Sequence, residues 1–183
     1  LTGKFCTSPD CITLHWVTDN RDIKNVRYDD RLIKMLGIPR EKLPDIRPST
    51  SIISHLKEDV ARMLGLDPAT PVAMGSPDLH SAAIGAGATD DYAGHLYLGT
   101  SSWLICHMPD KKTDPFTKMA SFPAAIPGKY LLLTEQQIAG EAFTILKDNL
   151  GFGLTCNTPE GVDMLSRFNR MAAQGAPGSG KLI

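Results

Sequence analysis

The sequence predicts a mixed α/β fold, and three patterns support that prediction. Two short segments with helical apolar spacing end at Gly37 and Gly65, and glycine is the residue that most often closes a helix in the left-handed conformation. An apolar run at 71–75 is too short for a helix and suits a buried strand. Two more apolar runs, at 95–98 and 102–107, flank a Gly-Thr-Ser-Ser turn and predict a hairpin.

The first two helices are predicted at 28–37 and 57–66. By helical spacing, their inward-facing residues are Leu32, Ile33, Leu36, Val60, Ala61 and Leu64. Between the helices, 43–48 is predicted to be an extended connector, because each of its two prolines disfavours helix in the residue before it.

A third helix, rich in small residues, is predicted at 79–88. It contains Gly85 and Gly87, and a glycine in a helix costs about 0.5–1 kcal/mol relative to alanine. We therefore expect another element to approach this helix closely and compensate for that cost. After the hairpin, a loop rich in Lys, Asp and Pro extends to Pro127, and its charged segment 110–114 is expected to be solvated.

The C-terminal part continues with a predicted strand at 129–133 and a helix at 140–149. A last helix is predicted from Thr158, an N-cap followed by Pro159, to Gly175. The residues expected on its inward face are Val162, Leu165, Phe168 and Ala172.

The composition is that of an ordinary globular protein and excludes several classes. The 183 residues carry a net charge of −1, without the basic excess of a nonspecific nucleic-acid binder. No window reaches the roughly 20 apolar residues of a membrane span, and no signal peptide opens the sequence, so we expect a cytoplasmic protein. Since the chain begins at Leu1 rather than Met, we expect it to be part of something longer.

The cysteines indicate neither a disulfide framework nor a metal site. Their spacing is irregular, and the close pair Cys6/Cys11 has no matching partner pair. The histidines never fall at metal-ligand spacing. The four cysteines expected to be free thiols are Cys6, Cys11, Cys106 and Cys156.

Asp78 is the first candidate for chemistry, because it ends the apolar segment 71–77 and precedes the small-residue helix. Aspartate before a helix is a common N-cap, and an ionised carboxylate can also accept a hydroxyl proton. The two roles are compatible, because a helix N-terminus favours the carboxylate form. His80, two residues further on, is expected on the solvated helix surface.

The turn Gly99-Thr100-Ser101 is the second candidate. Its backbone N–H groups and hydroxyls suit a phosphate, although the same residues also form ordinary hairpin turns. Trp103 is either a core residue or a ligand platform. A carboxylate at one strand end and a hydroxyl-rich turn after the next strand could hold an alcohol and a phosphate in one cleft, which suits phosphoryl transfer.

Residues 175–181, Gly-Ala-Pro-Gly-Ser-Gly-Lys, match the start of a phosphate-binding P-loop. The motif then needs Ser or Thr, and Leu182 stands there. It also needs a strand before it, whereas a helix is predicted. We therefore expect no P-loop in this segment.

Taken together, the segments resemble the middle of the FGGY carbohydrate kinases, the group that contains xylulokinase, glycerol kinase and ribulokinase. The order and spacing of the motifs are more specific than any one of them. In chain order, the motifs are Leu-Thr-Gly-Lys-Phe at 1–5, Gly37-Ile38, Leu43-Pro44-Asp45, Gly65-Leu66, Pro-Val-Ala-Met-Gly-Ser-Pro-Asp at 71–78, Gly-Ala-Gly at 85–87 and Leu98-Gly99-Thr100-Ser101.

This resemblance implies an actin/ribonuclease-H-like α/β fold of two lobes with the active site in the cleft. Residues 1–90 would be the C-terminal part of the first lobe, and 91–183 the N-terminal part of the second. The DxGT-type phosphate loop and the GER-type segment of the family are absent from the sequence. We therefore expect an interior piece of a longer kinase, inactive by itself.

The resemblance also implies ATP-dependent phosphorylation of a sugar or polyol hydroxyl, with a pentulose such as xylulose favoured. Asp78 would be the base that accepts the proton of the attacking hydroxyl. Leu79 and Trp103 fall where the family often touches the sugar, although Leu79 replaces a polar contact of some members. The residues implied for the nucleotide, whose phosphates Mg²⁺ would bridge, are Gly99, Thr100, Ser101, Gly140 and Thr144.

Two alternatives stay open. One is a non-catalytic actin-like module that binds a sugar or a partner protein, and the pairing of Asp78 with the 99–101 turn argues against it. The other is an acetate- or hexokinase-like enzyme on the same fold, which the spacing of the motifs at 1–5 and 71–78 disfavours. The oligomeric state is open, with a homodimer as one option.

Overall fold

The computed structural model describes residues 1–149, 164–176 and 178. The chain divides into two compact units, Leu1–Gly140 and Glu141–Ile183. The lobe boundary predicted after residue 90 is a different division and stays a prediction. Within the described ranges, no helix is long and apolar enough to cross a membrane.

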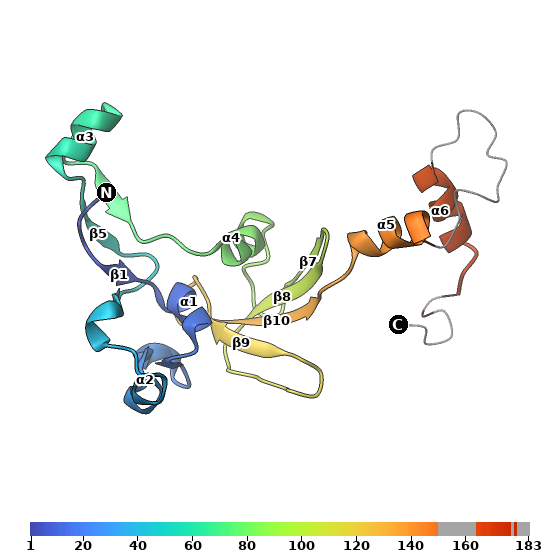
Figure 1. The fold of residues 1–183 in the computed structure, drawn as a ribbon, viewed down its shortest axis with the longest axis horizontal. Helices are drawn as coiled ribbons and strands as arrows, with labels where there is room; N and C mark the ends of the chain where they lie inside the picture. Colours follow the sequence, from blue (N-terminus) through green and yellow to red (C-terminus); the bar gives the residue numbers. More distant parts are fainter. Residues whose placement is uncertain (150–163, 177, 179–183) are drawn as a thin grey trace. The chain divides into compact units, whose positions relative to one another are not determined.

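A four-stranded antiparallel sheet is the main element of the first unit (Figure 1). Leu98 pairs with Ser102 across the first hairpin, which confirms the two predicted strands and the turn between them. Tyr130 pairs with Met108 on one side and with Pro123 on the other. In sheet order, the strands are β7 (Gly94–Leu98), β8 (Ser102–Met108), β10 (Tyr130–Gln136) and β9 (Ala120–Pro123).

β9 lies in the segment that the sequence predicted as a loop, so that prediction was wrong. Its four residues, Ala-Ser-Phe-Pro, are few and end in proline, so they carry no strand signal of their own. Pairing with β10 creates the strand, and β9 then supplies buried residues to the core.

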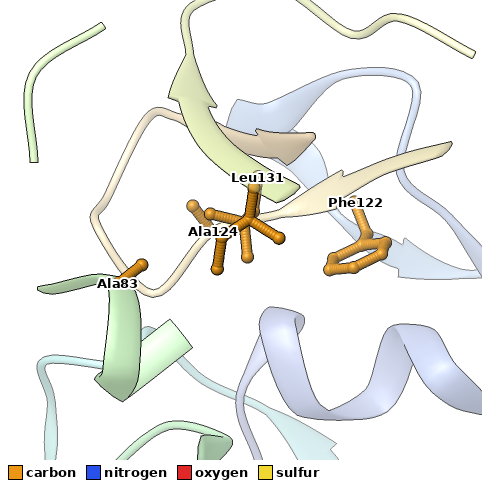
Figure 2. Close-up of a cluster of buried hydrophobic side chains, with 5 residues drawn as sticks. Ala83, Phe122, Ala124 and Leu131 are labelled. Atoms are coloured by element: carbon orange, nitrogen blue, oxygen red, sulfur yellow. The ribbon is translucent and has the colours of Figure 1, made fainter. Parts of the chain in front are cut away.

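Helix α4 (Asp78–Gly85) packs on this sheet through a small cluster of buried residues. Figure 2 shows Ala83 pointing from α4 toward Ala124 and Leu131. The members of the cluster are Ala83, Ile105, Phe122, Ala124 and Leu131, and Leu79, Trp103 and Leu133 pack against it.

The expected close approach is absent both at Gly85, the last residue of α4, and at Gly87, which lies beyond it. A Cβ built on Gly85 or on Gly87 would meet no atom within 4 Å. Gly87 is instead required by its backbone, because its φ of +81° lies in the left-handed region that other residues rarely adopt.

The two glycine-terminated helices are confirmed as α2 (Asp30–Leu36) and α3 (Glu58–Leu64). Gly37 and Gly65 adopt φ values of 64° and 69° and close them. Ile33 and Ala61 are buried as predicted, but Leu36 and Leu64 are exposed. Each helix therefore buries less apolar surface than its sequence pattern predicts.

Three pairs of short strands complete the first unit. β6 confirms the strand predicted at 71–75, but it is exposed or half-exposed rather than buried. The expected connector at 43–48 contains β4, which pairs in parallel with β1. The pairs are β1 (Cys6–Thr7) with β4 (Asp45–Ile46), β2 (Thr18–Asp19) with β3 (Arg27–Tyr28), and β5 (Ile52–His55) with β6 (Pro71–Ala73).

The segment predicted to be solvated at 110–114 ties the N-terminal region to the sheet through Lys111. Its ammonium donates to the side chain of Asn20 and to the carbonyl of Ser121, and it lies 5.7 Å from the ring centroid of Tyr130. The Tyr130 hydroxyl donates to the carbonyls of Asn20 and Arg21 at 3.1 and 3.0 Å. Lys111 therefore contributes to the packing of this unit.

Helix α5 (Gly140–Asn149) begins at the last residue of the first unit, and its other residues belong to the second unit. Helix α6 (Met164–Ala172) follows it in the second unit. Both agree with helices expected from the sequence. Thr158 and Pro159, the expected start of the last helix, lie outside the described residues, as do Cys156 and most of the P-loop-like segment.

Candidate active site

Asp78 is the first residue of α4, after an extended approach through Pro77, whose ψ is 157°. Pro77 therefore holds the N-cap position, and Asp78 lies in the first turn. Its Oδ1 accepts a hydrogen bond from the Leu79 N–H at 2.7 Å. Because the side chain is exposed, a substrate hydroxyl can reach the carboxylate, and the N-terminal end of the helix favours its negative charge.

Leu79 and Trp103, the two predicted sugar neighbours, are half-buried and pack against the same hydrophobic cluster. Leu79 follows Asp78 directly, and Trp103 follows Ser101 by two residues. The structure therefore attaches the carboxylate and the turn to one core, on α4 and on β8 respectively. Trp103 also stacks on Tyr97, with ring centroids 5.0 Å apart.

The Gly99–Ser101 turn joins β7 to β8 and is closed by the Gly99 N–H, which donates to the carbonyl of Ser101 at 2.8 Å. The Tyr97 side chain covers Gly99. A Cβ built on Gly99 would lie 2.6 Å from the Tyr97 hydroxyl oxygen, so a larger residue would force this ring to move. The turn is thus supported from one side by the Tyr97–Trp103 stack.

The turn is also joined to the start of α5 by two backbone hydrogen bonds. The Ala139 N–H donates to the Thr100 carbonyl and the Gly140 N–H to the Gly99 carbonyl, both at 2.8 Å. A Cβ on Gly140 would lie 2.6 Å from the Gly99 oxygen, so only glycine fits this approach. The structure therefore brings together three predicted nucleotide residues, Gly99, Thr100 and Gly140.

Thr144 lies four residues after Gly140 on α5 and is exposed. That spacing puts the two residues on one face of the helix. Thr144 belongs to the second unit, and its predicted contact with the nucleotide stays a prediction.

His80 contradicts its sequence-based assignment to a solvated surface, because it is only 1% exposed. Its Nδ1 lies 3.9 Å from Oδ2 of Asp10, which is equally buried, and its ring stacks on Phe122. The signal that could have revealed this is its spacing, since His80 lies three residues before Ala83 and so shares its buried face.

Burial lowers the pKa of His80 below its usual 6.5, although the carboxylate of Asp10 acts in the opposite direction. Burial also lowers the pKa of His107, whose Nδ1 lies 2.7 Å from the Ala88 carbonyl oxygen. Both imidazoles are therefore mainly neutral at pH 7. Asp78 contributes a smaller electrostatic interaction with His80, so the buried pair lies within the field of the candidate base.

A separate pocket of about 320 Å³ opens elsewhere in the first unit. Lys24 and Arg47 give it positive charge, and its other walls are mostly apolar. No site residue predicted from the sequence lines it. Its lining residues are Pro9, Ile23, Lys24, Asn25, Val26, Ile46, Arg47, Pro48, Ser49, Pro123, Ala124, Pro127 and Gly128.

Comparison with known proteins identifies the family. The model of the N-terminal domain of the FGGY family of carbohydrate kinases matches residues 1–85, a range that contains Asp78 and Leu79. Residues 1–85 of the chain belong to the FGGY carbohydrate kinase family. The resemblance seen in the sequence motifs is thereby confirmed.

Individual FGGY kinases align with most of the chain. The xylulose kinase of Lactococcus lactis is 26% identical over 136 residues, which are 74% of this chain and 27% of that protein. The gluconate kinase structure from Lactobacillus acidophilus matches with a TM-score of 0.80 at 27% identity, over 100% of this chain and 35% of that one. The Plasmodium falciparum glycerol kinase structure with ADP shares the fold, with a TM-score of 0.66 at 21% identity, over 81% of this chain and 29% of that one.

These matches establish a mixed α/β fold like that of the N-terminal part of FGGY kinase structures. The chain spans between 27% and 35% of the length of the three relatives. Because the relatives act on xylulose, gluconate and glycerol, the family membership leaves the sugar open.

Proposed function

We propose that the intact protein containing this chain transfers the γ-phosphoryl group of ATP to a hydroxyl of a sugar or polyol, with a pentulose such as xylulose favoured. In this proposal the complete protein has two actin/ribonuclease-H-like lobes. Residues 1–90 contribute to the first lobe and 91–183 to the second. The xylulose kinase relative supports the pentulose, and the ADP in the glycerol kinase structure supports ATP as the donor.

The observation that most supports the proposal is the common core beneath the two halves of the site. Leu79 and Trp103 pack against one cluster, so the exposed carboxylate of Asp78 and the 99–101 turn extend from the same packed region. Phosphoryl transfer depends mainly on positioning and electrostatics, and a shared rigid core supplies the positioning.

Each part of the site has its own role in the proposed reaction. Asp78 accepts the proton of the substrate hydroxyl as that oxygen bonds to the γ-phosphorus. The bond from the γ-phosphorus to the bridging oxygen breaks, and ADP leaves with the electron pair of that bond. The charge on the phosphates is met by the N–H groups and hydroxyls of Thr100 and Ser101. Gly99 and Gly140, whose N–H groups bond to carbonyls of the turn, shape it beside the nucleotide. The Thr144 hydroxyl is a further proposed contact of the nucleotide.

Mg²⁺ fits this arrangement as a companion of the nucleotide. In phosphoryl-transfer sites it usually binds phosphate oxygens, waters and one or two carboxylates. The described residues contain no group of three metal-ligating side chains, so we expect the phosphates to supply most of its ligands. Bound there, Mg²⁺ would neutralise the developing charge.

The test is Asp78→Asn in the full-length protein. Asparagine keeps the size of the side chain but cannot accept the proton, so kcat should fall by about 10²–10⁴, with little change in melting temperature. Asp30→Asn is the matched control, because Asp30 is also exposed and is the first residue of helix α2. Near-normal turnover in the Asp78→Asn variant would contradict the assignment of Asp78 as the base, whereas a wild-type protein without sugar-dependent turnover would favour a non-catalytic binding module.

A further inference from the structure

A buried polar contact joins α1 (Pro9–Ile12) to α4 outside the candidate reaction centre. Asp10 and His80 are each 1% exposed, and their facing atoms, Oδ2 and Nδ1, are 3.9 Å apart. The second oxygen of Asp10 accepts a hydrogen bond from the Ser49 hydroxyl at 2.5 Å. The carboxylate is thereby held in place through its other oxygen.

The contact is an electrostatic one, because 3.9 Å exceeds the length of a hydrogen bond. Neither Asp10 Oδ2 nor His80 Nδ1 makes a hydrogen bond within the described part of the chain. Buried polar atoms of this kind are normally paired, because an unpaired one costs free energy. The electrostatic attraction between them is therefore a contact that both atoms keep in the fold, and moving α4 away from α1 would weaken it.

The imidazole is also fixed on a second side. The ring of Phe122, on β9, stacks against His80 with centroids 5.7 Å apart and an interplanar angle of 15°. Since Phe122 belongs to the core cluster, His80 is clamped between α1 and the sheet.

The apolar packing of helix α4 on the sheet is limited. Ala83 is its buried apolar residue, and Figure 2 shows how short the side chain is that it directs at the sheet. Ile84 is 38% exposed, and Leu79 is half-buried. Small side chains make few packing contacts, so the contacts of His80 add to those of Ala83 and Leu79 in holding the helix in place. Beyond its C-terminal end, the contact between His107 and the Ala88 carbonyl holds the chain to β8.

We propose that His80 is a positioning residue, which Asp10 and Phe122 hold in place and which fixes the first turn of α4 and hence the carboxylate of Asp78. This inference rests on the proposed function of Asp78. His80 is buried and two residues away from the base, so it acts through the backbone of the helix. Displacing a reacting group by about 1 Å can lower a rate by about 10²-fold.

The test uses the full-length protein and measures kcat per ATP-binding site together with the KM values. His80→Phe keeps the volume and the stacking but removes the polar contact. We expect kcat to fall by about 10- to 100-fold, with the KM values for ATP and sugar changed by less than about threefold. His80→Asn should restore most of kcat, because its amide nitrogen takes the place of Nδ1. His80→Gln should not restore kcat, because its amide nitrogen reaches the place of Nε2 instead.

A double-mutant cycle tests whether Asp10 and His80 act together. If they act through one contact, the Asp10→Ala/His80→Phe variant should be no slower than the slower single variant. Val17→Ala is the matched control for stability, because Val17 is fully buried in a different cluster. It should lower the melting temperature without changing kcat per binding site. Hydrogen exchange of the α4 amides should accelerate in His80→Phe and not in Val17→Ala.

Failure of the positioning role and failure of the proposed function would give different results. Unchanged exchange in α4, unchanged kcat in His80→Phe, or effects that multiply in the double variant would overturn the positioning role. If His80→Phe does not fold, the Asn and Gln variants decide, and equal activity in both would overturn it. A wild-type protein without sugar-dependent ATP turnover would refute the proposed function itself, whatever the exchange of α4 shows.

Discussion

At the scale of single residues, the candidate site depends on backbone proximity as much as on functional side chains. Gly99 and Gly140 are implied by the family resemblance as nucleotide residues, and the structure gives a physical reason for each. Gly99 lies under the Tyr97 ring, and Gly140 approaches the Gly99 carbonyl too closely for any side chain. Both glycines therefore shape the turn before any ligand is present.

Gly140→Ala tests this close approach. The new Cβ would lie 2.6 Å from the Gly99 oxygen, which is backbone and cannot rotate away, so the two hydrogen bonds to the turn must break or lengthen. We expect ATP affinity of the full-length protein to fall by about tenfold or more, the equivalent of roughly 1.4 kcal/mol. Gly85→Ala is the control, because a Cβ there meets no atom within 4 Å. Unchanged ATP affinity in Gly140→Ala, measured by calorimetry, would contradict the role of the approach.

The buried histidines predict a dependence of stability on pH. Burial lowers the pKa values of His80 and His107 below 6.5, so below that pH the unfolded chain binds protons that the folded chain does not. Stability should therefore decrease as the pH falls from about 7 to about 5, by up to about 1.4 kcal/mol per pH unit for each histidine. His107→Gln should weaken this dependence, whereas His55→Gln, on an exposed residue, should not. Denaturant unfolding across this pH range measures it, and a stability independent of pH would show the account to be wrong.

At the scale of elements, the sequence predicted those helices and turns whose formation depends on residues close together in the chain. The glycine-terminated helices α2 and α3 and the β7–β8 hairpin could be predicted, because caps and turns are set by neighbouring residues. β9 could not, since it exists through pairing with β10, which follows it in the chain. The spacing of His80 from Ala83 could have indicated its burial, but its contact with Asp10, 70 residues away in the sequence, could not be predicted.

Some parts of the candidate site could likewise be predicted from the sequence, and others could not. Asp78 and the 99–101 turn could be singled out from short motifs and the family resemblance. The hydrogen bonds that bring Gly140 to the turn could not be predicted from residue types, because they join backbone groups about 40 residues apart. Likewise, the attachment of Leu79 and Trp103 to one cluster depends on how α4 packs on the sheet.

At the scale of the whole molecule, the chain is about a third of an FGGY kinase relative or less. Its surface carries large apolar side chains, of which Phe116, Met63 and Trp16 are 97%, 79% and 75% exposed. Exposed apolar patches favour association. The site described above also holds only some of the groups that phosphoryl transfer needs.

We therefore predict that these 183 residues, made alone, neither phosphorylate a sugar nor stay reliably soluble. Losing one electrostatic contact typically costs about 10²–10³ in rate, and a fragment lacks several together. Coupled ADP detection and light scattering on the purified fragment measure both properties. Sugar-dependent ATP turnover by the fragment, abolished by Asp78→Asn, would show instead that the active site is local to it.

The most direct test of the central claim is ADP formation by the intact protein, with ATP and a panel of pentuloses, polyols and sugar acids that includes xylulose, glycerol and gluconate. The account predicts ADP formation that depends on one class of sugar, with xylulose favoured. Asp78→Asn should lower this turnover by about 10²–10⁴, and Asp30→Asn should leave it unchanged. The absence of ADP formation with every sugar of the panel, or near-normal turnover in Asp78→Asn, would contradict the account.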